Sequence, residues 1–288
     1  MLEPIARFPW MRALLFLVLA GCNNLGSPAI TQLIQARQLA AEARVRFSRA
    51  SDASNRVVMS DSDETTVKFS EESRSQMNAL EKTLIDLEAV LNSLDFDPEL
   101  KILEQAQNAL ARYRRLDREI LTLAAESTNL KAERLAFGPA HDASQAFSDA
   151  LLPVLQQPSP RNQECRPKVL ALTAISAVRE IETRQAPHIA ASKDEVMTQL
   201  EKEMRAAELI ARDALHDLAP LGAPPAAAAA LQRFLDRNRE ILSLSRRNSN
   251  LRSLELSLGE KRPLTAACEQ SLQELSDALS QRTFPGTR

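Results

Sequence analysis

The sequence predicts an all-α protein built from two tandem antiparallel four-helix bundles, and three observations support this prediction. Good helix formers dominate, whereas aromatic residues make up only 4% of the 288 residues and there are only 6 glycines. Apolar residues recur at steps of three and four over long segments. Short groups of residues repeat at an offset of about 120 residues, which suits an internal duplication of a whole four-helix unit.

The first 21 residues have the layout of a secretory signal peptide. Arg7 and Arg12 precede an apolar run from Ala13 to Ala20, which is shorter than the roughly 20 residues of an ordinary membrane-spanning helix. We therefore expect residues 1–21 to be removed and the rest of the chain to lie outside the cytoplasm. An uncleaved anchor, or cleavage at another position, is an alternative with the same consequence for the location of the chain.

The segment Leu19-Ala20-Gly21-Cys22 resembles the lipobox of bacterial lipoproteins. The resemblance covers this segment only, and it implies cleavage before Cys22, acylation of that residue and attachment to a membrane through several acyl chains. Because Asn23 rather than an aspartate follows, the resemblance to enterobacterial lipoproteins implies the outer membrane, with the chain facing the periplasm. Residues 22–29 would then be a tether of turn-forming residues before the folded part.

The first predicted bundle spans residues 30–157. Heptad-like apolar steps from Met77 to Leu94 mark one buried face, and the spacing from Leu103 to Leu123 marks another. Asp97-Pro98 predicts a helix start, because a capping carboxylate precedes a proline at the first helical position. The expected helices cover residues 30–56, 62–95, 98–126 and 130–156.

The second predicted bundle spans residues 167–283 and repeats features of the first. The segment that begins at Met77 resembles the one that begins at Met197, and Glu119 to Leu123 resembles Glu240 to Leu244. The expected helices cover residues 167–190, 193–219, 226–247 and 250–282. Residues 158–166 are rich in proline and form the expected linker between the copies, and residues 284–288 form a tail.

The turn before the last helix of each copy is left open by the sequence. In the first copy, either Ser127-Thr128-Asn129 or Gly138-Pro139 could form it. In the second copy, Asn248-Ser249-Asn250 and Gly259 pose the same alternative. Either choice leaves each copy with four helices.

The order of features from Tyr113 to Leu151, and its repeat from Phe234 to Leu275, resembles the periplasmic four-helix sensor module of methyl-accepting chemotaxis receptors. The resemblance is one of pattern over most of residues 30–282, and it implies recognition of small solutes such as amino acids at helix interfaces. The sequence departs from that family because we find no second membrane helix, no signalling linker and no long coiled coil. A receptor role would therefore need a partner protein, and no ligand-binding residue can be transferred.

No catalytic or metal-binding pattern is recognisable. His141, His188 and His216 share no spacing, and only Asp213 and His216 approach the Glu-x-x-His pattern of di-iron bundles, without the second copy that such a site needs. No nucleophile elbow, phosphate loop or haem-attachment motif occurs. The 36 basic and 38 acidic side chains are interspersed, which argues against nucleic-acid binding. We expect neither enzyme activity nor a cofactor.

Two interpretations are open for Cys165 and Cys268 once Cys22 is assigned to the lipid. A pair of cysteines in an oxidising envelope compartment favours a disulfide. Cys268 also falls on an apolar stripe with Leu272 and Leu275, which favours a small buried thiol. Because a disulfide needs Cα atoms within about 7 Å, it would require the segment around Cys165 to fold back along the bundle or the last helix to extend past it.

Arg37, Arg44 and Arg46 are candidates to hold an anionic group between helices, because guanidinium groups bind carboxylates in a bidentate way. Pairing with neighbouring acids is the alternative. Two functions follow: an envelope lipoprotein whose non-catalytic bundle binds a small solute or a partner protein, or a spacer or adaptor lipoprotein without a ligand. A polar pocket inside a bundle would favour the first, and continuous leucine and alanine packing would favour the second.

Overall fold

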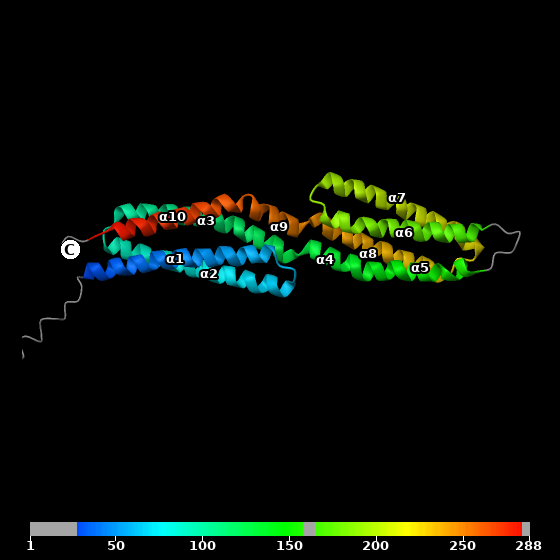
Figure 1. The fold of residues 1–288 in the computed structure, drawn as a ribbon, viewed down its shortest axis with the longest axis horizontal. Coiled ribbons are helices and arrows are strands. Elements are labelled where there is room, and N and C mark those ends of the chain that lie inside the picture. The colour runs from blue at the N-terminus through cyan, green and yellow to red at the C-terminus, as the bar shows by residue number, and fades with distance from the viewer. Residues whose placement is uncertain (1–27, 158–164, 284–288) are drawn as a thin grey trace, which may run out of the picture. The chain divides into compact units, whose positions relative to one another are not determined.

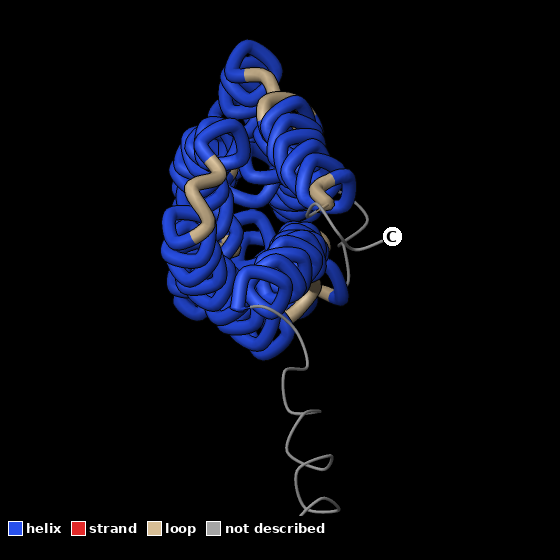
Figure 2. Tube along the Cα trace, turned by 90° about the vertical axis from the view of Figure 1, so that its left-hand side faces the viewer, coloured by secondary structure: helices blue, strands red, loops and turns tan. Residues whose placement is uncertain are grey.

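The computed structural model describes residues 28–157 and 165–283 (Figure 1). Within these ranges the regular elements are all helices, joined by short loops and turns, and no strand occurs (Figure 2). The predicted all-α class is therefore confirmed. The predicted signal peptide, Cys22 and the tail lie outside the described residues, together with most of the tether and most of the linker.

The helical segments begin and end within two residues of the positions expected from the sequence. The first half of the chain contains α1 (Pro28–Val58), α2 (Asp63–Ser93), α3 (Asp97–Glu126), α4 (Thr128–Leu135), the π-helical turn η2 (Ala136–Ala140) and α5 (His141–Gln156). The second half contains α6 (Arg166–Ala190), α7 (Asp194–Leu218), the 3-10 turn η3 (Ala219–Leu221), α8 (Pro225–Arg247), α9 (Ser249–Leu258) and α10 (Lys261–Gln281).

Each half has a one-residue interruption before its last helical segments. Ser127 separates α3 from α4 and Asn248 separates α8 from α9, and both residues have left-handed backbones, with φ of 49° and 52°. Gly138-Pro139 does not break the first half, because both residues lie in the π-helical turn that leads from α4 into α5. Gly259 does separate α9 from α10, so the halves share the first break and differ at the second.

The two interruptions bind each other and form what we call the joint, residues 127–129 and 248–250. The amide of Thr128 donates to Ser249 Oγ at 3.1 Å, and the amide of Ser249 donates to Thr128 Oγ1 at 3.0 Å. The backbone N–H of Asn129 donates to Oδ1 of Asn250 at 3.1 Å, and the backbone N–H of Asn250 donates to Oδ1 of Asn129 at 3.2 Å. Helix N-termini leave amide donors unpaired. In the joint, the N-terminus of α4 is capped by side chains of α9, and the N-terminus of α9 is capped by side chains of α4.

The last helix of each half packs against helices of the other half. α5 contributes to one core with α6, α7 and α8, whereas α10 contributes to another with α1, α2 and α3. Among the described residues, unit 1 contains 28–51, 73–113 and 264–283, and unit 2 contains 52–72, 114–157 and 165–263. This division differs from the contiguous bundles 30–157 and 167–283 that the sequence led us to expect.

The length of the interruptions explains the difference. Two antiparallel helices are usually joined by a connection of about two to eight residues, because the chain must reverse its direction. Ser127 and Asn248 are connections of one residue each. The chain therefore runs onward from α3 into α4, and from α8 into α9, and the last helix cannot fold back on its own half.

Buried positions recur between the halves, at two different offsets. From α3 onward the offset is 121 residues, as between the joint residues Thr128 and Ser249. It relates the buried pairs Tyr113 and Phe234, Ile120 and Ile241, Phe147 and Cys268, and Leu151 and Leu272. For α1 and α2 the offset is about 131 residues, and it relates the buried pairs Phe47 and Val178, Ser73 and Met204, and Leu80 and Ala211.

The second offset shows where the sequence comparison misaligned α2 with α7. Met77 had been matched to Met197 at an offset of 120, whereas the burial pattern places Thr66 at the position of Met197. The eleven residues between the two alignments make about three helical turns, so the same face is apolar in either alignment. The matching burial supports the hypothesis of an internal duplication, which stays a hypothesis.

Candidate functional site

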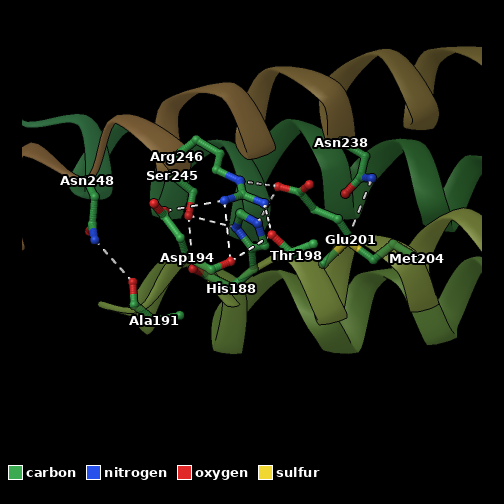
Figure 3. Close-up of polar contacts among 10 residues, drawn as sticks. All are labelled: His188, Ala191, Asp194, Thr198, Glu201, Met204, Asn238, Ser245, Arg246 and Asn248. Carbon is green, nitrogen blue, oxygen red and sulfur yellow. Dashed lines mark hydrogen bonds and ion pairs between the residues drawn. The ribbon is translucent and has the colours of Figure 1, made fainter. Parts of the chain in front are cut away.

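A buried polar cluster lies where α6 ends, and Figure 3 shows its contacts. The side chain of His188 is fully buried in the last turn of α6. Its Nδ1 lies 2.8 Å from Oγ of Ser245 on α8, and its Nε2 lies 3.0 Å from Oε1 of Glu201 on α7. Arg246 completes this His188 cluster, because its Nε donates to the same Glu201 oxygen at 2.6 Å.

The helical repeat of α6 carries His188 into the core. Ala174, Val178 and Ile181 form the buried face of this helix, and the same spacing continues through Gln185 to His188. The apolar face therefore becomes polar in the last two turns. Gln185 is satisfied by Asn238 of α8, to which it donates at 2.9 Å. This continuation of an apolar spacing by polar residues is the signal that could have identified the cluster in the sequence.

The negative charge next to the His188 ring lies on the carboxylate of Glu201. The hydrogen bond from Arg246 lowers the pKa of Glu201, and burial opposes this effect. Arg246 also reaches Asp194, whose Oδ1 lies 3.3 Å from the guanidinium. Burial lowers the pKa of His188 below its ordinary value, and the hydrogen bond to Glu201 acts in the opposite direction. Glu201 is therefore the carboxylate that stays ionised beside the ring, and the ring of His188 is the group whose charge can change, at a pH below its ordinary pKa.

A second buried cluster joins α1, α3 and α10. Nζ of Lys261 lies 2.9 Å from Oδ1 of Asp117, and the two side chains are only 2% and 5% exposed. Ser54 accepts a hydrogen bond from Lys261 at 2.6 Å and donates one to Asp117. Burial lowers the pKa of Lys261, and the charge of Asp117 opposes this effect. At the positions that the 121-residue offset relates to Asp117 and Lys261 stand the neutral residues Asn238 and Ala140.

The three candidate arginines of α1 have different roles. Arg37 binds the end of α10, where its guanidinium donates to the carbonyls of Leu279, Ser280 and Arg282 at 2.9, 3.1 and 2.8 Å. Arg46 pairs with Glu42 one turn away, at 2.9 Å. Arg44 has neither a hydrogen bond nor an ion pair within the part of the chain that the structure describes, and its side chain lines a groove.

That groove opens between α1 and α10 in unit 1 and has a volume of about 740 Å³. Its floor includes the buried side chains of Phe47 and Leu272. Arg44 and Glu269 are exposed on its rim and carry opposite charges from opposite helices. The groove therefore combines an apolar floor with charged groups of both signs.

The disulfide interpretation of Cys165 and Cys268 is not supported, since both cysteines are free. Cys165 is exposed before the first residue of α6, whereas Cys268 is buried in the core that α10 forms with α1, α2 and α3. Burial raises the pKa of the Cys268 thiol to about 12. The buried position of Cys268 in a packed helical core corresponds to the buried-thiol alternative.

The described residues bring together no group of three or more His, Cys, Asp or Glu side chains that could hold a metal ion. His141 pairs with Glu182 at an exposed position, and His216 lies on the wall of a groove between α7 and α8. Ser245, His188 and Glu201 are hydrogen-bonded in series, as in a hydrolase. However, Ser245 is fully buried, and none of the three main grooves is lined by these residues.

No protein-family model matches this chain, and no curated protein matches it in sequence. A search of the described helices for a stretch long and apolar enough to span a membrane finds none. The function is therefore inferred from the geometry of the groove and of the buried clusters.

Proposed function

We propose that this chain is a lipid-anchored protein of the bacterial envelope whose non-catalytic helical bundle binds a small amphipathic solute between α1 and α10. The groove carries the proposal, because its volume of about 740 Å³ lies within the range of small-molecule sites. In the interiors of the two units, leucine, alanine and phenylalanine side chains form the hydrophobic cores.

The chemistry of the groove defines the class of solute. Phe47 and Leu272 offer an apolar floor, and the guanidinium of Arg44 is available for a carboxylate. Glu269 on the opposite rim can accept hydrogen bonds from an ammonium group. Amides of Gln270 and Gln273 can donate to or accept from either end. A solute with an apolar body and a carboxylate, with or without an amine, fits these groups.

A thermal-shift screen of the full-length chain in detergent tests the binding of solutes. Apolar amino acids and organic acids are expected to raise the melting temperature, because a ligand that binds only the folded state stabilises it. Ala266→Trp should abolish the rise, since the indole would fill the groove from its exposed wall. Ala206→Trp on the exposed surface of α7 is the matched control and should keep the rise.

The rim charge has its own variant in the same screen. Arg44→Gln should weaken the response to carboxylate-bearing solutes while leaving the melting temperature without ligand unchanged, because Arg44 has no partner among the described residues. A flat response to every compound, or an unchanged response in Ala266→Trp, would contradict solute binding. A spacer or adaptor role that involves only a partner protein would then remain, and the continuous apolar cores favour that second candidate.

The proposed anchor is tested separately in bacterial cells. Metabolic labelling with palmitate should label the wild-type chain, and Cys22→Ser should abolish the label and release the chain from the membrane fraction. Cys165→Ser, at an exposed free thiol, is the control that should retain both label and membrane association. Equal labelling of wild type and Cys22→Ser would contradict the anchor, whatever the outcome of the solute screen.

A further inference from the structure

The hydroxyl of Ser245 has two acceptors within reach and a single hydrogen to donate. Its Oγ lies 2.8 Å from Nδ1 of His188 and 3.0 Å from the backbone carbonyl oxygen of the same residue. A carbonyl oxygen can only accept a hydrogen bond. When the hydroxyl donates its hydrogen to the carbonyl, the contact between Oγ and Nδ1 is therefore a hydrogen bond only if Nδ1 itself carries a proton.

The opposite side of the ring has no such choice. Nε2 of His188 faces the carboxylate of Glu201 at 3.0 Å, and an ionised carboxylate can only accept. Glu201 stays ionised because the hydrogen bond from Arg246 lowers its pKa. Nε2 therefore keeps its hydrogen in either charge state of the ring, and Nδ1 is the position where a proton is gained or lost.

We infer that His188 is a proton-binding switch, in which the charge of the ring decides whether the Ser245 hydroxyl donates its hydrogen bond to Nδ1 or to the His188 carbonyl. Without a proton on Nδ1, the hydroxyl donates to Nδ1. When Nδ1 takes one proton from the solvent, its N–H donates to Ser245 Oγ and the hydroxyl turns to the His188 carbonyl. Only a hydroxyl rotation is needed, and every polar atom of the ring is hydrogen-bonded in both states.

The groups around the ring favour a reversible change of charge. Glu201 on α7 contacts the ring directly, and Arg246 on α8 pairs with both Glu201 and Asp194 of α7. On α6 itself, Arg184 is paired with Glu203. From α4, the side chain that reaches this turn is the neutral amide of Asn129. With a neutral ring, Glu201, Asp194 and Arg246 sum to one negative charge, and protonation of His188 balances it.

Burial sets the pH at which the switch operates. The pKa of His188 is lowered from its ordinary value of 6.5, because desolvation of the charged ring outweighs the attraction of Glu201. The ring is therefore neutral at neutral pH and becomes charged only at a pH below its ordinary pKa of 6.5. Between the ordinary value and the lowered one, the unfolded chain binds more protons than the folded chain, so stability falls as the pH drops through this window. Below the lowered value this contribution no longer changes.

The switch lies next to the acceptors that hold the joint. The side-chain Nδ2 of Asn129 donates to the carbonyl of Ile189 at 2.9 Å, and Nδ2 of Asn248 donates to the carbonyl of Ala191 at 3.1 Å. The two asparagines also bind each other at 2.8 Å. The His188 carbonyl accepts a hydrogen bond from the backbone N–H of Ala191 and can accept a second one from the hydroxyl of Ser245. The turn that responds to the switch is therefore the turn whose carbonyls bind both asparagines.

Nitrogen NMR of the full-length chain, labelled with ¹⁵N-histidine, tests the switch directly. The chain has three histidines, so a His188→Gln spectrum assigns the signals of this ring. We expect Nε2 of His188 to stay protonated while Nδ1 titrates, with a midpoint below the ordinary histidine value of 6.5. Glu201→Gln should lower the midpoint further, by about one pH unit, since it removes the opposing charge. Glu203→Gln, two residues further along α7 at a side chain that pairs with Arg184, should leave it unchanged.

The rotation of the hydroxyl has a separate readout. The carbonyl ¹³C signal of His188 should shift with the same midpoint as Nδ1 in the wild type, and should lose this shift in Ser245→Ala while the ring still titrates. A midpoint at or above the ordinary histidine value of 6.5, a proton that leaves from Nε2, or a carbonyl signal that responds equally in Ser245→Ala would each overturn the inference. None of these outcomes depends on the groove in unit 1.

Discussion

Replacing Lys261 by methionine is expected to lower the free energy of unfolding by about 3–5 kcal/mol, because it removes one partner of a buried ion pair. Asp117 would keep only the hydroxyl of Ser54 in a site where its side chain is 5% exposed. A buried carboxylate without a partner destabilises the folded state, because its lost hydration is not replaced by other interactions. Urea denaturation of the full-length chain, followed by circular dichroism at neutral pH, measures the change.

The positions related to this ion pair by the 121-residue offset supply the matched control. Asn238 and Ala140 occupy the positions equivalent to Asp117 and Lys261, and Asn238 is satisfied by the neutral amide of Gln185. The combination of Asp117→Asn, Lys261→Ala and Ser54→Gln transfers that neutral arrangement. It should recover most of the stability that Lys261→Met loses, since no charge is left without a partner. If the single variant were as stable as the combination, the buried ion pair would not have the role assigned here.

Shortening Phe147 to alanine is expected to cost about 3–5 kcal/mol, because the side chain is fully buried and its removal leaves a large cavity. Phe147 belongs to α5, which packs with α6, α7 and α8. The loss should therefore weaken those helices of the second half, although Phe147 belongs to the first half by sequence. Hydrogen exchange followed by mass spectrometry should show faster exchange in α6 to α8 and little change in α1 and α2.

Leu275→Ala is the reciprocal variant, since Leu275 is fully buried in the core that α10 forms with α1, α2 and α3. It is expected to cost about 2–5 kcal/mol and to speed exchange in α1, α2 and the first part of α3. Variants that loosened only the helices of their own half would contradict the exchange of last helices between the two halves.

The sequence around Arg44 and His188 does not reveal which side chains of other helices lie beside them. Arg44 was among the arginines considered for an anion site, but its sequence neighbourhood resembles that of Arg46, which pairs with Glu42. Only the position of α10 distinguishes the two, because it places the opposite wall of the groove beside Arg44. His188 was recognised as a histidine without companions, since Glu201 and Ser245 approach it from α7 and α8.

The sequence alone determined the helices of this protein and their ends. Apolar spacing and Asp97-Pro98 act over a few residues, so they can be recognised without knowing the fold. The sequence left open whether Ser127 or Gly138, and whether Asn248 or Gly259, breaks the helix, and the structure places the first break at Ser127 and Asn248. The tertiary structure alone decided which core each last helix joins. That choice depends on two one-residue connections, and on hydrogen bonds of the joint between residues 121 positions apart, such as Thr128 and Ser249. Apolar helical faces of similar spacing can pack with several partners, so periodicity could not select among them.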